Sequence, residues 1–274
     1  MGSNKIVSMR ELSVKSIEFG VVRVNDHGSK NVYVKYGGQR MYVKMGKLPV
    51  PFGVGTAKED ASKFNVQFGL PKGNVNSEII KRKGEELDEY IINAAYENQD
   101  NWFTNKSGKK MSREVIASKY HPFVKPSSKE MYPPNIRAQL PTVNRDGELT
   151  YSTEFYDENN NIKEGVNMEN IREVIPAQSQ CSSLWTASSV WVSSTGFGIS
   201  WKLVQVKVYK PEGLNLQGKC LITDEEEEEE EEYEEETKSV EETQSVEEES
   251  DEAITETVPE PEVKVVKKKV VGKK

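Results

Sequence analysis

The sequence predicts a mainly β protein with one inserted helix, arranged as an OB-fold-like antiparallel barrel and followed by a disordered acidic tail. Both ends of residues 14–210 alternate apolar and polar side chains with the period of a strand. One segment, 77–96, has apolar residues at helical spacing. Residues 224–262 are too acidic and too poor in apolar side chains to form a core. An OB-fold accommodates this order of elements, and a β-sandwich stays an alternative.

The first alternating region, residues 14–46, is predicted to form a three-stranded antiparallel meander. Strands over 16–24, 32–36 and 40–45 are separated by a turn-forming segment at 25–29 and by Gly37-Gly38. Neighbouring side chains of a strand point to opposite faces, so one face of the meander is aliphatic. The other face carries the aromatic and basic side chains Tyr33, Lys35, Arg40, Tyr42 and Lys44.

The middle of the chain is predicted to combine loops, one helix and short strands. Pro49 and Pro51 lack the amide that a central strand needs, so residues 48–55 are expected to form a rigid crossover. A strand over 63–70 precedes the helix, for which Ser77 is the expected cap and Trp102 a candidate end. Residues 105–147 are expected to be rich in loops. A hairpin over 149–157 and 161–166 and a strand over 171–175 follow.

The core closes with a second predicted hairpin, in which residues 183–192 and 199–209 are joined by the turn 193–196. Regular alternation in the last strand places Val204, Val206 and Val208 on one face. The opposite face then carries Trp201, Leu203, Gln205, Lys207 and Tyr209.

Charge divides the chain into unlike parts. Residues 224–262 hold 22 acidic side chains and one lysine, a net charge of −21, and residues 263–274 hold six lysines. The remaining 30 basic and 23 acidic side chains give +7, and +7 − 21 + 6 returns the net charge of −8. We therefore expect an N-terminal extension over 1–13, a binding core over 14–223, a disordered acidic tail over 224–262 and a basic segment over 263–274.

Motifs for catalysis, cofactors and metals are missing from the sequence. The acidic residues of the core are scattered, there is no glycine-rich phosphate loop, and Cys181 lacks a histidine nearby in sequence. Two cysteines and two histidines, widely spread, do not match a structural zinc site. No apolar run reaches the roughly 18 residues of a membrane span, and no signal peptide is evident. We expect an intracellular binding protein, not an enzyme, with no cofactor and no membrane contact.

Aromatic and basic side chains that share a strand face predict binding of single-stranded nucleic acid. Lysine and arginine neutralise phosphates, and aromatic rings stack on exposed bases. The predicted DNA-binding residues are Tyr33, Lys35, Arg40, Tyr42 and Lys44 in the meander and Trp191, Trp201, Lys207 and Tyr209 in the closing hairpin. The alternative is that tryptophans form core, which we expect for one of Trp185, Trp191 and Trp201.

Short motifs along residues 14–210 also carry a family resemblance. They are Pro51-Phe52-Gly53-Val54, Tyr120-His121-Pro122, Tyr132-Pro133-Pro134, Leu184-Trp185, the segment 197–203 and Gln205-Val206-Lys207-Val208. Together they resemble the single-stranded-DNA-binding proteins of nucleocytoplasmic large DNA viruses, which resemble the OB-fold single-strand binders of tailed phages. The resemblance implies an OB-fold, coating of single strands in DNA replication, recombination or repair, and an acidic C-terminal arm. The lysine-rich end of this chain departs from that pattern.

The expected function is sequence-nonspecific binding of single-stranded DNA, with RNA as a further ligand. The acidic tail is expected to modulate binding of DNA or of replication and recombination proteins. The expected location is the site of viral DNA replication in the infected cell, with the virion as an alternative. Two other functions stay open: a viral structural or assembly protein, and an acidic-tailed chaperone for basic proteins.

Overall fold

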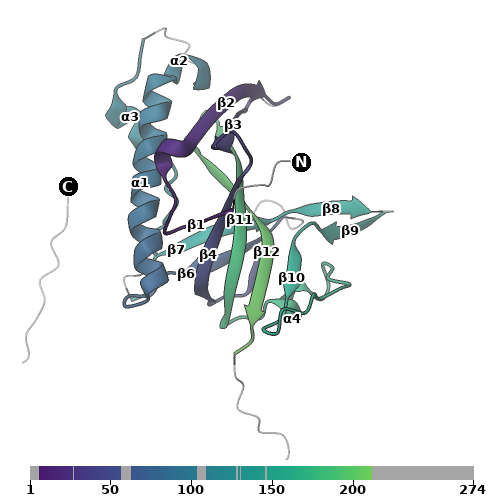
Figure 1. Ribbon diagram of the computed structural model, residues 1–274. Coiled ribbons are helices and arrows are strands. Elements are labelled where there is room, and N and C mark those ends of the chain that lie inside the picture. The colour runs from purple at the N-terminus through teal and green to yellow at the C-terminus, as the bar shows by residue number, and fades with distance from the viewer. Residues whose placement is uncertain are drawn as a thin grey trace, which may run out of the picture. The chain divides into compact units, whose positions relative to one another are not determined.

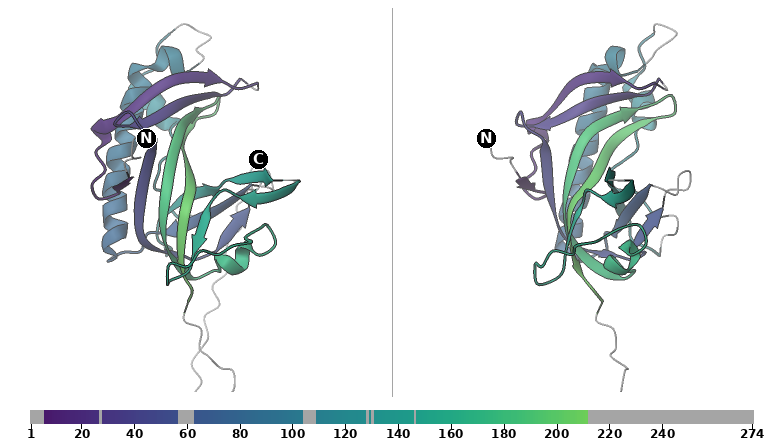
Figure 2. Two further views of the ribbon diagram at one scale, coloured as in Figure 1. Left: turned by 45° about the vertical axis from the view of Figure 1, so that its right-hand side comes forward. Right: turned by 90° about the vertical axis from the view of Figure 1, so that its right-hand side faces the viewer.

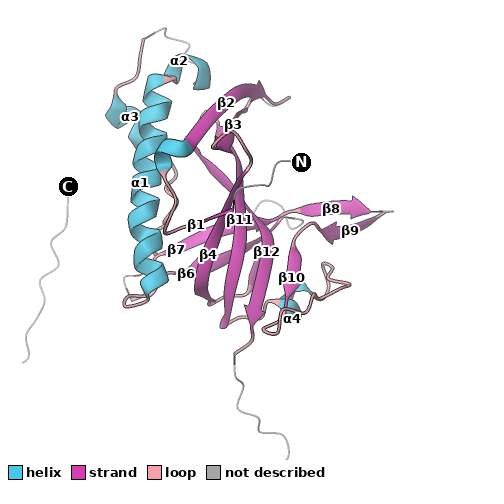
Figure 3. Cartoon of the chain, in the orientation of Figure 1, coloured by secondary structure: helices cyan, strands magenta, loops and turns pink. Residues whose placement is uncertain are grey.

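The computed structural model describes residues 6–26, 28–56, 63–103, 109–127, 129, 131–145 and 147–211. The chain divides into two units, Met1–Gly213 and Leu214–Lys274, and all described residues belong to the first. Strands dominate this unit and one long helix is inserted among them, which confirms the predicted fold class (Figure 1, Figure 3). The predicted disordered tail lies outside the described residues.

The described residues form twelve strands and five helical segments. The strands are β1 (Ile6–Ser8), β2 (Ile17–Val24), β3 (Lys30–Tyr36), β4 (Met41–Val50), β5 (Val54–Thr56), β6 (Phe64–Gly69), β7 (Asn135–Leu140), β8 (Thr142–Arg145), β9 (Glu148–Tyr151), β10 (Glu154–Tyr156), β11 (Ser179–Val192) and β12 (Phe197–Tyr209). The helices are the 3-10 turn η1 (Val14–Ser16), α1 (Val75–Glu97), α2 (Gln99–Trp102), α3 (Arg113–Ser118) and α4 (Ile171–Val174).

Five strands form a partly open barrel in the order β4-β11-β12-β7-β6, and β6 comes back into contact with β4. The pair β12–β7 is parallel and the other pairs on this path are antiparallel. This is an OB-like arrangement (Figure 2). The interior is filled by fully buried side chains such as Val43, Phe68, Trp185 and Val206.

The predicted meander is only half correct. Strands β2 and β3 pair as expected, and the valines and methionines assigned to the aliphatic face are buried. The predicted pairing of β3 with β4 is wrong, because the long strand β11 pairs with β4 through residues 179–187 and with β3 through residues 189–192. A partner from more than a hundred residues away replaces the nearer strand. Local alternation carries no signal for such a pairing.

Strand β4 also continues through Pro49, where a crossover was predicted. Pro49 lies opposite Gln180 of β11. On the other side of β4, the pairing with β1 covers only Tyr42 to Lys44 and ends before the proline. Because no described strand pairs with β4 on that side at Pro49, the missing amide of Pro49 interrupts no hydrogen bonds there. Prolines in strands are commonly found at such unpaired edges.

The inserted helix α1 starts two residues earlier than predicted and packs beside the barrel (Figure 1). Its cap is Asn74, not Ser77, because the Asn74 side chain accepts a hydrogen bond from the Ser77 amide at 3.0 Å. Gly84 lies on the buried side, where a Cβ atom would approach Phe123 at 3.0 Å and Val124 at 2.9 Å. A glycine at this position lets the segment after α3 lie directly against the helix.

The segment expected to be mostly loop contains α3 and the barrel strand β7. Strands β8 and β9 form a separate hairpin that projects from the barrel (Figure 1). The predicted strand over 161–166 is limited to an isolated bridge at Ile162, and residues 171–174 form the short helix α4. These predictions are wrong, because two or three apolar residues in so short a segment do not distinguish a strand from a helical turn or a loop.

Regular alternation also fails in β12. The pairing of β12 with β11 shifts register where Leu184 pairs with Gln205 and Trp185 pairs with Leu203, so Val204 is an extra residue. Such a bulge reverses which face the following side chains occupy. Trp201 and Leu203 are buried, Lys207 and Tyr209 are only half-buried, and the prediction that Trp201 shares a face with Lys207 and Tyr209 is wrong.

Candidate nucleic-acid interface

The structure separates the nine predicted DNA-binding residues into three groups. Trp191 and Trp201 line one cavity of the barrel unit. Arg40, Tyr42, Lys44, Lys207 and Tyr209 lie on the outer face of β4, β11 and β12. Tyr33 and Lys35 lie on β3, which leaves the barrel together with β2.

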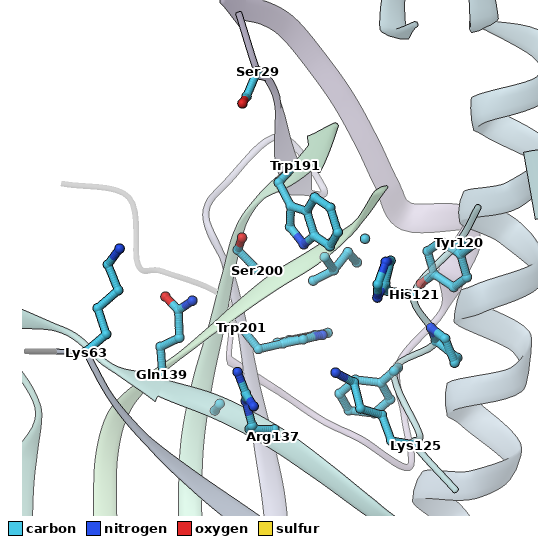
Figure 4. A pocket seen from close by; sticks show the side chains of 15 residues that line it. Ser29, Lys63, Tyr120, His121, Lys125, Arg137, Gln139, Trp191, Ser200 and Trp201 are labelled. Carbon is cyan, nitrogen blue, oxygen red and sulfur yellow. The ribbon is translucent and has the colours of Figure 1, made fainter. Parts of the chain in front are cut away.

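The cavity that holds the two tryptophans has a volume of about 690 Å³ and is named here the aromatic–basic cleft. Its wall comes from the β11–β12 hairpin, the segment after α3, strand β7 and the residue before β6 (Figure 4). The residues that carry its chemistry are Lys63, His121, Lys125, Arg137, Gln139, Trp191, Ser200 and Trp201. No acidic side chain is among the described residues that line it.

The aromatic side of the cleft is formed by Trp191 and His121. Their ring centroids are 5.1 Å apart with the planes inclined by 55°. The His121 amide donates to the Phe197 carbonyl at 2.8 Å, which fixes this segment on the hairpin. Gly198 makes the approach possible, because a Cβ atom there would lie 3.2 Å from His121 and 3.3 Å from Trp191. Trp191 is half-buried and His121 exposed, so both rings present surface to a ligand.

Trp201 contributes to the cleft differently. Only 5% of it is exposed, and its ring packs against Phe123 at 5.1 Å and Trp185 at 5.9 Å between centroids. A ring held between two others offers no free face for a base. Trp185 and Trp201 are therefore both core, where the sequence led us to expect one of the three tryptophans, and Trp191 remains the candidate for stacking.

The basic side of the cleft contains Lys125 and Arg137, and Figure 4 shows both side chains directed into the cavity. Partial burial lowers the pKa of Lys125, and the nearby positive charge of Arg137 lowers it further. Within the described residues neither cation forms an ion pair with a carboxylate. Two cations held close together without a counter-charge favour an anionic ligand.

A carboxylate behind the cleft positions the segment that carries His121 and Lys125. Asp88 on α1 accepts hydrogen bonds from the Tyr120 hydroxyl at 2.7 Å and from the Phe123 amide at 3.1 Å. Burial raises the pKa of Asp88 to about 6, although both hydrogen bonds lower it. Burial, with the Asp88 charge, raises the pKa of Tyr120 well above its ordinary value, so the tyrosine remains a donor.

The outer face combines tyrosines and cations, but these groups already contact one another. Arg40 lies 5.6 Å from the centroid of Tyr42, and Lys47 lies 3.9 Å from that of Tyr209. The Lys207 ammonium donates to the Asn160 side chain at 2.7 Å. The carboxylate of Glu154 lies at the margin of this face, where it accepts from Gln205 at 2.7 Å. The outer face is thus less open to bases and phosphates than the cleft.

On β3 the alternation is as predicted, with Tyr33 and Lys35 exposed and Val32 and Val34 buried. The Arg23 guanidinium lies 5.1 Å from the Tyr33 ring centroid. These residues belong to the β2–β3 extension and do not line the cleft.

Sequence reasoning missed the part of the cleft that comes from the middle of the chain. His121 is not among the predicted DNA-binding residues, and Lys125, Arg137 and Gln139 fall in the segment 105–147, which was expected to be rich in loops. Two signals were available: aromatic residues and a lysine in Tyr120–Lys125, and the alternation Ile136-Arg137-Ala138-Gln139-Leu140, typical of a strand.

Within the described residues, neither a cluster of metal ligands nor an activated thiol is found. No three His, Cys, Asp or Glu side chains are arranged there to hold a metal ion. Burial raises the pKa of the Cys181 thiol to about 12, so the thiolate needed for nucleophilic attack does not form near neutral pH. In the same residues, no helix is both long and apolar enough to cross a bilayer.

Solved structures that are similar to this chain include two single-stranded DNA-binding proteins of bacteriophages. One is the single-stranded DNA-binding protein from bacteriophage Enc34 in complex with ssDNA, with 14% identity and a TM-score of 0.36 over 70% of this chain and 91% of that chain. The other is gp2.5, a single-stranded DNA binding protein encoded by bacteriophage T7, with 11% identity and a TM-score of 0.40 over 66% and 98%.

No curated protein matches the sequence. A family model does match, over residues 59–216 of the 274, a segment that includes all of α1, β7, β11 and β12. Since this match covers more than half of its length, the chain belongs to DUF5871, a family of unknown function.

Proposed function

We propose that this protein binds single-stranded DNA without sequence preference in the aromatic–basic cleft. One observation carries the proposal: the rings of Trp191 and His121, 5.1 Å apart, share a cavity with the cations Lys125 and Arg137. Base stacking and phosphate neutralisation are the two contributions that sequence-tolerant binding requires. The proposed activity is binding, with no chemical step.

The arrangement of the cleft suggests how a strand would lie in it. Bases would stack on Trp191 and His121, the two rings that present surface. Phosphates would face Lys125 and Arg137 on the opposite wall (Figure 4). Trp201 would form the floor between the two walls, since it is held by Phe123 and Trp185. A duplex keeps its bases paired and stacked, so it could not use the ring wall.

Weak sequence preference follows from the kinds of side chain in the cleft. Rings stack on any base, and cations contact phosphates, which are the same in every nucleotide. Among the described residues that line the cavity, the short neutral polar side chains are Gln139 of β7, Ser200 of β12 and Ser29. Few such groups are available to read base edges.

The biological role that we propose is in replication, recombination or repair of the DNA of a large virus. This part rests on the family resemblance of the sequence motifs. We also propose that residues 224–262, with a net charge of −21, modulate the binding of DNA or of partner proteins, because a polyanion competes with phosphates for cations.

The test is a titration of the full chain into a fluorescein-labelled oligothymidylate of thirty nucleotides. Binding is measured by fluorescence anisotropy at two salt concentrations. We expect binding that weakens steeply with salt, and much weaker binding to a duplex of the same length. Trp191→Ala should weaken binding, while the matched outer-face variant Tyr42→Ala should not. Equal binding of duplex and single strand, or no binding in either salt, would refute the proposal.

A further inference from the structure

Strand β2 is an edge strand that exposes apolar side chains. Val21 is 74% exposed and Val24 65% exposed. Within the described residues β2 pairs with β3 and with no other strand. The unpaired side of such a strand presents amides and carbonyls that another strand can pair with, and natural proteins seldom leave it both long and apolar.

A bulge gives this edge an unusual symmetry. The pairing of β2 with β3 shifts register between Phe19 and Val22, so Gly20 and Val21 form the bulge. Phe19 and Val22, the residues next to the bulge, pair with buried valines of β3 and share their face. The next residues outward, Glu18 and Arg23, are exposed and share the opposite face.

The residues on the two sides of the bulge therefore occupy the two faces of the sheet in the same order: the first residue on each side lies on the buried face and the second on the exposed face. In an antiparallel pair, directly opposed residues must lie on one face. A second β2 strand, turned by a twofold axis through the bulge, meets this condition at each position. It places Glu18 opposite Arg23 of the second copy and Phe19 opposite Val22 of the second copy. A twofold interface repeats each contact, so two opposite-charge pairs and two apolar pairs form.

The groups involved are accessible in the single chain. Glu18 is exposed and uses one carboxylate oxygen to accept from the Gly38 amide at 2.9 Å. Arg23 is exposed, with its guanidinium against the Tyr33 ring. The Tyr90 hydroxyl donates to the Ile17 carbonyl at 2.9 Å, so the available edge begins at Glu18. A ladder over residues 18–23 fits this space.

We propose that the partner of this edge is a second copy of the chain, paired antiparallel through β2 about a twofold axis at Gly20-Val21. Charge complementarity supports a second copy over an unrelated strand. Glu18 and Arg23 lie the same number of residues from the bulge, on opposite sides of it. In this register, Glu18 of one copy is therefore opposite Arg23 of the other copy, and their charges are complementary. The proposal does not depend on DNA binding.

Sedimentation equilibrium of the full chain without DNA tests the proposal. We expect the wild type to dimerise as its concentration rises. Glu18→Arg or Arg23→Glu alone turns both charge pairs into like-charge pairs, and each should weaken the dimer by about tenfold or more. A mixture of the two single variants should dimerise again, because each chain then opposes the other with complementary charges. Lys44→Glu, on the outer face of β4 and away from β2, should leave the dimer unchanged.

The mixture also controls for folding, because a chain that had lost the fold could not restore the dimer. A wild type that stays monomeric at all concentrations would overturn the proposal. A dimer that neither charge reversal weakens would overturn it too, because the interface would then lie elsewhere. A mixture that stays as monomeric as its components would show that Glu18 and Arg23 do not face each other.

Discussion

The indole of Trp191 and the imidazole of His121 lie 5.1 Å apart, although one belongs to β11 and the other to the segment after α3. Gly198 of β12 allows this approach, since a Cβ atom there would lie 3.3 Å or less from both residues. The contact joins the closing hairpin to the middle of the chain and forms the aromatic wall of the cleft.

Removal of the Trp191 ring should weaken binding of single-stranded DNA. A ring stacked on a base contributes about 1–3 kcal/mol, so Trp191→Ala should raise the Kd by about tenfold or more. Trp191→Phe keeps a ring and should recover most of the affinity. Anisotropy of labelled oligothymidylate measures both. If alanine and phenylalanine bind as tightly as tryptophan, Trp191 is not a stacking platform.

Removal of a cation from the opposite wall should change the salt dependence of binding. Each phosphate contact to a single strand contributes about 0.7 to the slope of log K against log salt. Arg137→Ala should therefore reduce this slope by about 0.7, and Lys125→Ala should do the same. The control is Lys44→Ala on the outer face, for which we expect the wild-type slope. A larger loss for Lys44 than for Arg137 would place the phosphates on the outer face.

Asp88 should make stability depend on pH. Its pKa is about 6 in the folded chain, whereas an unfolded aspartate has a pKa of about 4. Between these values the folded state holds the proton more tightly, so the contribution of Asp88 to stability is greatest below pH 4 and is lost as the pH rises through 6. Relative to the wild type, Asp88→Asn should gain on the order of 2 kcal/mol in unfolding free energy from pH 4 to pH 7.

Urea unfolding of the two proteins at several pH values measures this difference, and other titrating groups cancel from it. Asparagine keeps an oxygen that can accept from Tyr120 or Phe123, so the variant should fold. A stability difference that does not change between pH 4 and pH 7 would show that the Asp88 carboxyl is not protonated in the folded chain at pH 5.

Gly84 should not tolerate alanine. Alanine favours a helix interior over glycine by about 1 kcal/mol, but overpacking costs about 1–3 kcal/mol. The added Cβ atom would lie 2.9 Å from Val124 and 3.0 Å from Phe123. We expect Gly84→Ala to lower the melting temperature and to weaken DNA binding by displacing the segment with His121 and Lys125. The neighbouring exposed change Glu85→Ala is the control, and equal melting temperatures for both variants would contradict this packing.

A chain that ends at residue 223 should bind single-stranded DNA more tightly than the full chain. It lacks the 22 acidic side chains of residues 224–262 and the six lysines that follow, so its net charge rises from −8 to +7. The difference should shrink as salt is added, because salt screens the charges. Anisotropy with both chains measures it. Equal affinities at low salt would mean that the tail does not modulate DNA binding.

Local sequence predicted the parts of this fold that depend on local chemistry. Alternation correctly placed Val32, Val34, Met41 and Val43 in the core, and the turn at 193–196 joins β11 to β12 as expected. The spacing of apolar residues located α1 to within two residues at its start. In each case the signal lies within one element, where periodicity of side chains determines which face is buried.

The remaining features depend on contacts between distant segments. Nothing near Met41 or Val32 indicates that both strands pair with β11. Valine is common in regular strands, so the sequence does not mark Val204 as the extra residue of a bulge. That bulge nevertheless places Trp201 on a different face from Lys207 and Tyr209. Most of the candidate site was missed for the same reason. Arg137 and Gln139, for example, line the cleft because β7 joins the barrel through a parallel pair with β12.

Photo-crosslinking shows directly where on the protein a bound single strand lies. An oligothymidylate with 5-iodouracil at single positions is bound to the full chain, irradiated and mapped by mass spectrometry of the peptides. The cleft predicts adducts on Trp191 or His121, which are lost when unlabelled single-stranded DNA competes. Adducts confined to Tyr33, Tyr42 or Tyr209, with none on Trp191 or His121, would place the DNA outside the cleft and rule out the proposed binding site.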